Sequence, residues 1–484
     1  MTARCIMVLG TTSGAGKSWL TTALCRYYAR KGLKVAPYKA QNMSNNARVV
    51  AGGEIGSAQY FQALAANVVP EVRMNPLLLK PEKDTQSQVV LMGQVNIELS
   101  SMDWRGRSLL VWPVVAQALD ELMAENDVVV IEGAGSPAEI NLSASDIVNM
   151  RVAVHANAQC LLVTDIDRGG AFAHLYGTWA LLPETERRLI KGFVLNRFRG
   201  DASLLAPGPQ MLQNLTGIPT VATLPMWWQH GLPEEDGVFD DRTTAQGRVT
   251  KTIAVIAYPR ISNLDEFQPL KNVPGVRLKW VRSPAELMDA DWVILPGSKA
   301  TSADLGWLRT QGLDQAIAAH AAGGRAVLGI CGGLQMLGEA LIDPHGVDGN
   351  APGLGLLPVV TVFEEAKTVQ QRQATFGEVA GAWSALSAVD VQGYEIHHGQ
   401  TAQHPAMAAT GDIAVAVLPQ GLAWQNPAGN VLGIYLHGMF EDPRVLQALF
   451  GAATPTLESV FDGLADYITK HFEPGVLQSL IAPH

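Results

Sequence analysis

The chain has 484 residues, 48% of them hydrophobic and 17% charged, which predicts a globular protein of two or three domains. Its net charge of -10 and the lack of a basic stripe argue against a nucleic-acid partner. The four cysteines lack C-x-x-C spacing, which argues against a disulfide framework and a zinc site. The N-terminus is unlike a signal peptide, and no apolar run is long enough for a membrane span, so we expect a cytoplasmic protein.

The first predicted strand, residues 5–9, leads into the glycine-rich loop GTTSGAGKS and then into a helix over residues 19–30. This order predicts a phosphate cradle, because backbone N–H groups and the helix N-terminus face the anion. Lys17 is expected to reach the β- and γ-phosphates of ATP, and the Ser18 hydroxyl to ligate Mg²⁺. The loop residues assigned to nucleotide binding are Gly10, Thr11, Gly14, Gly16, Lys17 and Ser18.

The loop is one residue longer than the common phosphate-binding form, and Thr11 stands at the expected glycine position. In this respect it resembles the loop of dethiobiotin synthetase-like ATPases, which phosphorylate a carboxylate. A partition-type ATPase of the same superfamily is the competing interpretation. Those ATPases carry an extra lysine near the start of the loop, where this chain has Thr12, so the resemblance favours the carboxylate-activating class.

Two charged residues farther along the chain are expected to complete the nucleotide site. Lys39 follows a short predicted strand, residues 34–37, and Glu132 follows the apolar strand 128–131. Open α/β sheets bind ligands at the carboxyl ends of their strands, and Mg²⁺ takes one or two protein carboxylates beside the phosphates. We therefore assign Glu132 to Mg²⁺ together with Ser18. A solvated strand-end acid and a surface lysine are the alternatives.

Further apolar strand-like runs alternate with helical patterns through both halves of the chain. Because strands buried on both faces and separated by helices indicate parallel sheets, we expect an α/β protein with two doubly wound parallel-sheet domains. These further strands are predicted at residues 160–164, 192–195, 221–224, 252–257, 292–295, 326–330 and 431–436. A polar seam between the halves predicts a first domain over residues 1–226, a linker over 227–250, a second domain over 251–450 and a helical tail over 451–484.

The strand 326–330 runs into the sequence GICGG, with Cys331 at its centre. A G-x-C-x-G turn has the form of a nucleophile elbow, in which a tight strand-to-helix turn lifts the nucleophile clear of the sheet. The N-terminus of the following helix favours the thiolate. A buried structural cysteine is the alternative, but such a residue does not need glycines on both sides. We therefore assign Cys331 as a catalytic nucleophile.

A catalytic thiolate also needs an oxyanion site and a base. The strand 292–295 ends in a Pro-Gly-Ser turn, and the backbone N–H groups around Gly297 could form an oxyanion hole with that of Gly332. His437 follows the predicted strand 431–436 and is the preferred base. His397 and His398 are the competing histidines.

The elbow GICGGLQ followed by a strand-end histidine resembles the class I glutamine amidotransferases. In that family the cysteine attacks the side-chain amide of glutamine, forms a thioester and releases ammonia. The resemblance implies that Gln335 and the Gly297 turn help to hold glutamine. One departure is that Met439 stands where the family has a glutamate, two residues after the histidine. Glu441 lies nearby, but the third member of this Cys–His site stays unidentified at the sequence level.

A carboxylate-activating ATPase fused to an ammonia source predicts ATP-dependent amidation, in which ammonia displaces phosphate from an acyl phosphate. Fusion keeps ammonia near the acyl phosphate at a high effective concentration. Motifs for a more specific resemblance run through both halves: KAQNMSNN (39–46), GGEIGSAQ (52–59), MNPLLLKP (74–81), EGAGSPAEINL (132–142), DIDRGG (165–170), NRFRGD (196–201), LPEED (232–236), GYEIHHG (393–399) and LHGMF (436–440). With these motifs the chain resembles the cobyric acid synthase family of cobalamin biosynthesis.

That resemblance implies four glutamine-dependent amidations, at the b, d, e and g carboxylates of adenosylcobyrinic acid a,c-diamide. Its implied partners are the corrin, glutamine and ATP, and the oligomeric state is left open. The family has arginine where this chain has Ser57, which puts a substrate contact there in doubt. The anionic corrin would need positively charged residues around it. Four basic residues expected in loops are candidates: Lys80, Arg168, Arg197 and Arg199. Solvated surface charge is the alternative interpretation of these residues.

Three other functions compete with this interpretation. Cobyrinic acid a,c-diamide synthase would perform the same chemistry on an earlier substrate. Cytidine triphosphate synthase is more distant, because its amidotransferase normally keeps the glutamate that is replaced here. A scaffold or partition ATPase with an inactive amidotransferase domain would not need Cys331 and His437. Because a Cys–His dyad is weakly poised alone, we also expect glutamine hydrolysis to rise when ATP and the corrin bind.

Overall fold

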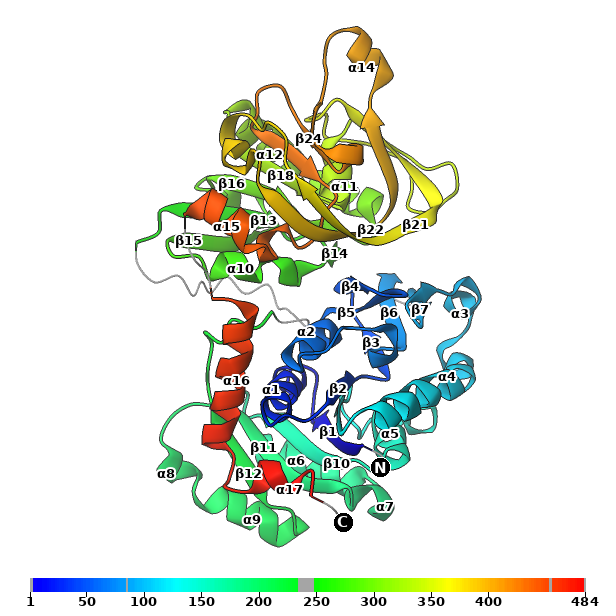
Figure 1. Cartoon of the computed structure of the whole chain (residues 1–484), viewed down its shortest axis with the longest axis vertical. Helices are drawn as coiled ribbons and strands as arrows, with labels where there is room; N and C mark the ends of the chain where they lie inside the picture. Colours follow the sequence, from blue (N-terminus) through cyan, green and yellow to red (C-terminus); the bar gives the residue numbers. More distant parts are fainter. Residues whose placement is uncertain (1–2, 84–85, 234–247, 452–454, 483–484) are drawn as a thin grey trace. The chain divides into compact units, whose positions relative to one another are not determined.

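The computed structural model describes residues 3–83, 86–233, 248–451 and 455–482. The chain forms two compact units. Unit 1 consists of Met1–Ser44, Val50–Asp236 and Thr456–His484, and unit 2 consists of Asn45–Val49 and Gly237–Pro455. Each unit is built on a mostly or entirely parallel sheet, which confirms the predicted α/β class with two doubly wound domains (Figure 1).

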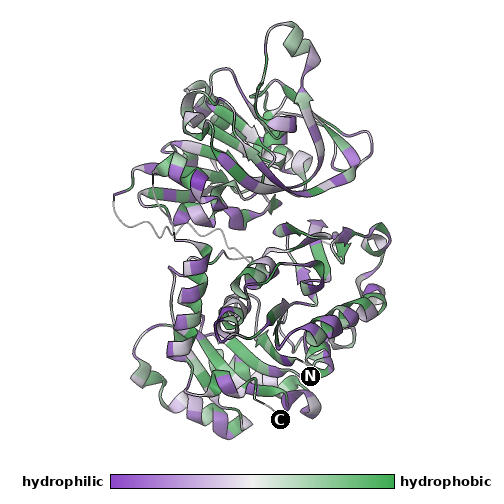
Figure 2. Cartoon of the chain, in the orientation of Figure 1, coloured by the Kyte–Doolittle hydropathy of each residue, from purple (hydrophilic) through white to green (hydrophobic). Residues whose placement is uncertain are grey.

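The sheet of unit 1 has six strands in the order β12-β11-β10-β1-β9-β2, and all of its pairings are parallel. These strands lie close to the predicted ranges: β1 (Arg4–Gly10), β2 (Val35–Tyr38), β9 (Val128–Glu132), β10 (Gln159–Asp165), β11 (Ile190–Phe198) and β12 (Thr220–Pro225). They are hydrophobic along most of their length, as Figure 2 shows, because helices cover both faces of the sheet. The strand order changes direction at β1, so the phosphate loop that follows β1 lies at a switch point of the sheet.

Alternate residues of β1 pack into two different cores on the two faces of this sheet. Ile6 and Val8 pack with α1 (Lys17–Arg30), α2 (Ser57–Ala65) and α16 (Leu457–His471). Met7 and Leu9 pack on the other face. The helices there include α4 (Trp104–Glu125), α5 (Met150–His155) and α6 (Ala171–Leu181). Period-2 alternation with both faces buried is the mark of a doubly wound sheet.

The C-terminal helix α16 is part of unit 1. Arg26 of α1 forms ion pairs with Asp462 (2.8 Å) and Glu458 (2.7 Å) of α16. Trp227 stacks on Tyr467 with ring centroids 4.8 Å apart. Most of the predicted linker, residues 234–247, lies outside the described residues, and the predicted domain boundaries stay predictions.

The sheet of unit 2 has seven strands in the order β15-β13-β16-β18-β25-β24-β23. The first five are parallel and the last two antiparallel. Their bounds are β13 (Lys251–Ile256), β15 (Val276–Val281), β16 (Trp292–Leu295), β18 (Ala326–Ile330), β23 (Val415–Leu418), β24 (Ala423–Gln425) and β25 (Val431–Ile434). Helices α11 (Thr301–Thr310), α12 (Leu313–Ala322) and α15 (Pro443–Phe450) belong to the same unit.

Several features of unit 2 depart from the sequence-based expectations, and strands β15, β23 and β24 of its sheet were not predicted. Strand β25 ends at Ile434, so the prediction that the strand reaches residue 436 was two residues too long. A long antiparallel pair, β21 (Val359–Thr375) with β22 (Asp390–Gln403), was not predicted at all. Among the described residues of the whole chain, no helix is both long enough and apolar enough to cross a membrane.

Candidate active sites

The phosphate loop of unit 1 joins the end of β1 to the start of α1. Gly16 is the N-cap of α1, and its φ of 103° lies in the left-handed region that favours glycine. A Cβ atom at Gly16 would lie 2.1 Å from Nδ2 of Asn196, which donates a hydrogen bond to the carbonyl of Ala15 (2.9 Å). The hydrogen bond from Asn196 of β11 therefore ties the loop to the sheet, and only glycine fits at position 16.

Glu132 is the centre of a buried polar cluster beside this loop. Its Oε1 accepts hydrogen bonds from Ser18 Oγ and Lys39 Nζ, both at 2.8 Å. Its Oε2 accepts one from Gln62 Nε2 at 2.5 Å. Burial opposes ionisation of this carboxyl, but the charge of Lys39 and the three hydrogen bonds outweigh burial and lower the pKa of Glu132. The sequence assigned Ser18, Lys39 and Glu132 to the nucleotide site separately, and in the structure Ser18 and Lys39 both contact Glu132.

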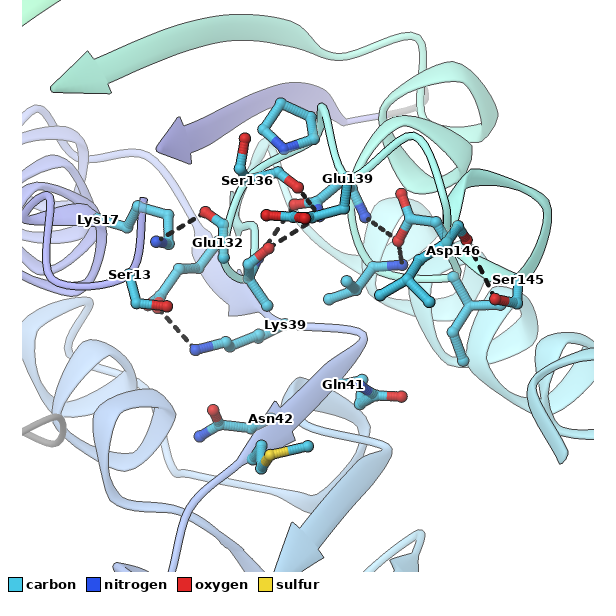
Figure 3. Close-up of a pocket in the computed structure, with 18 of the residues that line it drawn as sticks. Ser13, Lys17, Lys39, Gln41, Asn42, Glu132, Ser136, Glu139, Ser145 and Asp146 are labelled. Atoms are coloured by element: carbon cyan, nitrogen blue, oxygen red, sulfur yellow. Dashed lines mark hydrogen bonds and ion pairs between the residues drawn. The ribbon is translucent and has the colours of Figure 1, made fainter. Parts of the chain in front are cut away.

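Lys39 and Glu132 line a cavity of about 360 Å³ (Figure 3). Lys17 lies at the same end of the cavity and donates hydrogen bonds to the carbonyls of Thr12 (3.0 Å) and Gly135 (3.2 Å). Another wall of the cavity is formed by residues of the segment 134–149, which follows β9. The Asn149 side chain braces this segment, because its Nδ2 donates to the Ala134 carbonyl (2.8 Å) and its Oδ1 accepts from the Ala134 amide (3.1 Å).

The elbow of unit 2 places Cys331 between β18 and the short helix α13 (Gly332–Leu337). Cys331 has φ 51° and ψ -106°, a conformation that a non-glycine residue rarely adopts. Its amide donates to the Ile434 carbonyl (2.7 Å), which ties the elbow to β25. The turn is tight enough that a Cβ atom at Gly333 would lie 1.9 Å from the carbonyl oxygen of Leu295. Backbone strain at the candidate nucleophile, enforced by close packing, agrees with the elbow interpretation.

His437 lies at this elbow and is buried, with 1% of its surface exposed. Its Nδ1 lies 3.1 Å from Oε1 of Glu266, and Oε2 of Glu266 accepts the amide of Gly438 at 2.9 Å. Burial alone would lower the pKa of His437, but the negative charges of Glu266 and Cys331 outweigh burial and raise the pKa to about 10. Glu266 is therefore an acidic neighbour of His437, which Met439, two residues after the histidine, cannot be.

The Gly297 turn lies against His437 and against Gly332 of the elbow. Gly297 and Ser298 form β17, which pairs with β14 (Ile261–Ser262). A Cβ atom at Gly297 would lie 2.6 Å from Cε1 of His437, and one at Gly332 would lie 2.9 Å from the amide nitrogen of Ser298. The backbone of this turn therefore approaches the backbone of the elbow closely, as an oxyanion site requires.

The two competing histidines of unit 2, His397 and His398, both contact other groups of the protein. His397 lies between Glu395 Oε2 (2.9 Å from Nε2) and the Gly399 carbonyl (2.8 Å from Nδ1). Burial lowers the pKa of His398 to about 4, and its Nδ1 lies 3.1 Å from the Glu364 carbonyl. These contacts favour His437 as the base.

Gln335 and Glu441 are also engaged within unit 2. The Gln335 amide accepts from Thr301 Oγ1 (3.3 Å) and donates to the Tyr435 hydroxyl (3.4 Å). Glu441 pairs with Arg48 at 2.6 Å. The predicted role of Gln335 in holding glutamine stays a prediction.

The basic residues considered for corrin binding form ion pairs within unit 1. Lys80 is buried and lies 2.7 Å from Oε2 of Glu54, so it is not a surface charge. Arg197 and Arg168 lie 3.0 Å and 3.4 Å from Oδ2 of Asp165. Arg199 pairs with Asp167. Three of the four candidates thus gather on two acidic residues at the carboxyl end of β10.

Glu266 is the functional candidate that sequence reasoning missed. It lies 171 positions before His437, outside any strand end or glycine-rich turn. Gln62, which completes the Glu132 cluster, lies within α2 and was also missed. The only sequence signal for Glu266 was the acidic pair Asp265-Glu266, two residues after Asn263. Such a pair of acidic residues is common on protein surfaces.

The family comparisons match both halves of the chain. Residues 6–230 match the family described as CobQ/CobB/MinD/ParA nucleotide binding domain. Residues 252–445 match the family described as CobB/CobQ-like glutamine amidotransferase domain. The phosphate loop therefore lies in a nucleotide-binding domain, and Cys331 and His437 lie in a glutamine amidotransferase domain.

Full-length relatives share one description. A protein of Polaromonas naphthalenivorans described as cobyric acid synthase is 86% identical over all of both chains. One of Leptothrix cholodnii with the same description is 63% identical and covers 99% of this chain and 98% of that protein. A solved structure described as a glutamine amidotransferase is 18% identical, covers 41% of this chain and 99% of its own, and has a TM-score of 0.31.

Proposed function

Since the chain belongs to the cobyric acid synthase family, confirming the resemblance found in its motifs, we propose that it uses ATP and glutamine to amidate the b, d, e and g carboxylates of adenosylcobyrinic acid a,c-diamide. The observation that carries this proposal is the pairing, in one chain, of a phosphate cradle around Lys17 and Glu132 with a Cys331–His437 elbow. The first can activate a carboxylate and the second can supply ammonia.

In the nucleotide site, the loop amides and Lys17 would hold the phosphates of ATP. The substrate carboxylate would attack the γ-phosphorus, and ADP would leave, so that an acyl phosphate forms. Lys39, which forms an ion pair with Glu132 at 2.8 Å, would contact the transferred phosphoryl group. Ammonia would then attack the acyl carbon and expel phosphate, with loss of a proton, to give the amide.

Mg²⁺ fits the same cluster. Ser18 Oγ and the Glu132 carboxylate offer two oxygen ligands in contact, and Mg²⁺ commonly takes one or two protein oxygens beside phosphate and water. Among the described residues no group of three or more His, Cys, Asp or Glu side chains could hold a metal ion, so an all-protein cage is not offered there. When bound, Mg²⁺ would neutralise charge on the phosphates.

In the amidotransferase site, the Cys331 thiolate would attack the side-chain carbonyl carbon of glutamine. The backbone N–H groups of Gly332 and of the Gly297 turn would hold the oxyanion. His437 would protonate the leaving ammonia and then take a proton from the water that hydrolyses the thioester to glutamate. Glu266 would orient His437 through Nδ1 and stabilise its charged form, as the third member of the triad.

The decisive experiment is mass spectrometry of the corrin after incubation with ATP, Mg²⁺ and glutamine. Four amide nitrogens added to the a,c-diamide are expected. Two additions to the unamidated acid, with none to the a,c-diamide, would instead assign the chain to the a,c-diamide synthase reaction. Small molecules are thus the proposed partners, and a cytoplasmic location accords with a biosynthetic role.

A further inference from the structure

A short segment from early in the chain belongs to the compact unit that contains Cys331. Unit 2 includes Asn45–Val49. Two hydrogen bonds fasten this segment to the turn around Asn263: the Leu264 amide donates to Asn46 Oδ1 (3.0 Å), and the Ala47 amide donates to Asn263 Oδ1 (2.9 Å). Asn263 is the N-cap of the 3₁₀ turn η3 (Leu264–Phe267), which carries Glu266. The segment is therefore attached directly to the element that presents Glu266.

Arg48 is the charged residue of this segment, and 1% of its surface is exposed. Its guanidinium forms ion pairs with Asp265 and, at 2.6 Å, with Oε1 of Glu441. Its Cζ also lies 5.1 Å from the ring centroid of Tyr394. A planar guanidinium can pair with two carboxylates and pack on a ring at the same time, which a lysine cannot reproduce.

The three partners of Arg48 lie on three of the elements beside His437. Asp265 precedes Glu266 in η3, and Glu441 ends η7 (Met439–Glu441), which begins two residues after His437. Tyr394 of β22 stacks on the His437 ring, with centroids 5.5 Å apart. Tyr394 and His437 also exchange backbone hydrogen bonds of 3.1 Å and 2.9 Å. Arg48 thus contacts three residues that lie on elements adjoining His437.

Arg48 also offsets a concentration of buried negative charge. Asp265, Glu266 and Glu441 are close enough to influence one another, and burial raises the pKa of Glu441 to about 7 even with the guanidinium beside it. Without a cation at this place, electrostatic repulsion would push these carboxylates apart. That displacement would disturb the carboxylate of Glu266 that faces His437.

We propose that Arg48 is a positioning residue for glutamine hydrolysis, which holds η3, η7 and Tyr394 so that Glu266 and His437 keep their mutual geometry. It acts through these neighbours and does not touch glutamine. The inference rests on the proposed glutaminase function of Cys331 and His437. It adds to that function a residue that lies 218 positions before Glu266 in the sequence.

The test compares Arg48→Met and Arg48→Lys with the unaltered chain in two assays on the same preparations: steady-state glutamine hydrolysis with ATP, Mg²⁺ and the a,c-diamide, and amidation from ammonium chloride. We expect Arg48→Met to lower kcat for glutamine hydrolysis by roughly 10- to 100-fold with KM changed by less than about twofold, since an interaction that serves only the transition state lowers kcat alone. Amidation from ammonium should be unchanged.

Arg48→Lys keeps the positive charge, so the proposal can still be tested with it if Arg48→Met does not fold. It should lose about tenfold in kcat and shift the alkaline limb of the pH profile to lower pH, because a single ammonium holds the pair less firmly. Arg277→Met, at an exposed ion pair with Asp289 in the same unit, is the matched control and should match the unaltered chain.

Wild-type kcat and pH profile in both Arg48 variants would overturn the proposal and leave the proposed function standing. Equal loss of the ammonium-dependent reaction in Arg48→Lys would also overturn it, because the residue would then serve general stability. If the unaltered chain hydrolysed no glutamine under any of these conditions, the proposed function itself would fail.

Discussion

The partnership of Glu266 with His437 makes the sharpest prediction. Glu266→Gln keeps the size of the side chain but removes its charge from a position where Oε1 lies 3.1 Å from Nδ1 of His437. At an effective dielectric constant near 20, two unit charges about 4 Å apart interact by about 4 kcal/mol. Since one pKa unit corresponds to about 1.4 kcal/mol, the variant should lower the pKa of His437 from about 10 back towards the ordinary value of histidine.

This change has a kinetic and a thermodynamic consequence. A His437 that is neutral at pH 8 no longer stabilises the Cys331 thiolate, so we expect alkylation of Cys331 by iodoacetamide and kcat for glutamine hydrolysis to fall roughly 10²-fold at that pH. Because the folded-state pKa of His437 is raised, its stabilising contribution is complete below the unfolded value near 6.5 and is lost as the pH rises towards 10. The difference in unfolding free energy between the two proteins should therefore be largest at low pH and shrink towards pH 10.

The assays are pH-dependent alkylation, steady-state glutamine hydrolysis and urea unfolding at several pH values. Glu365→Gln serves as the control, because Glu365 belongs to the same unit and its side chain is 82% exposed. Amidation from ammonium should survive in Glu266→Gln. Unchanged alkylation and hydrolysis across the pH range would refute the assignment of Glu266 as the third member of the triad.

The remaining predictions concern the nucleophile, the phosphate loop and the elbow. Cys331→Ala should abolish glutamine-dependent amidation and leave ammonium-dependent amidation near the wild-type rate, measured by corrin mass; failure of ammonium to rescue it would contradict the division of labour. Lys17→Ala should lower amidation from either nitrogen source by about 10²–10³-fold, and retained activity would remove the phosphate cradle from the mechanism. Gly333→Ala should destabilise unit 2 by about 1–3 kcal/mol or more in urea unfolding, because its Cβ atom would meet the Leu295 carbonyl, whereas Gly306→Ala, with no atom near its Cβ position, should be neutral or slightly stabilising.

Features of the molecule that depend on short stretches of sequence could be predicted well. The strands β16 and β18 have the predicted bounds, because each is a compact apolar run between polar or glycine-rich turns. The elbow at Cys331 was predicted because glycines on both sides are a local requirement of the turn. The cluster of Ser18, Lys39 and Glu132 could be anticipated as well, since the carboxyl ends of parallel strands meet at one edge of a sheet.

Features that depend on distant contacts could not be predicted from the sequence. Glu266 and His437 are separated by 171 positions, and Arg48 and Asp265 by 217, and no periodicity links them. The long pair β21 and β22 was missed because many residues in these strands are half-buried or exposed, so their hydrophobic pattern is weak. The ion pairs of Lys80 on β6 (Leu77–Lys83) and Arg197 on β11 were not predicted either, because the sequence around a lone basic residue does not reveal its acidic partner.

The presence of Asn45–Val49 in unit 2 has a practical consequence for dissecting this enzyme. A fragment cloned as residues 251–450 would contain Cys331, His437 and Glu266, yet it would lack the guanidinium that pairs with Asp265 and Glu441. If Arg48 positions Glu266 as proposed, such a fragment should hydrolyse glutamine more slowly than the intact chain. The same would hold for chimaeras. Exchanging the C-terminal half for that of a relative would transfer Cys331, His437 and Glu266 without the segment that carries Arg48, which begins in the sequence two residues after Met43, a residue that lines the nucleotide cavity.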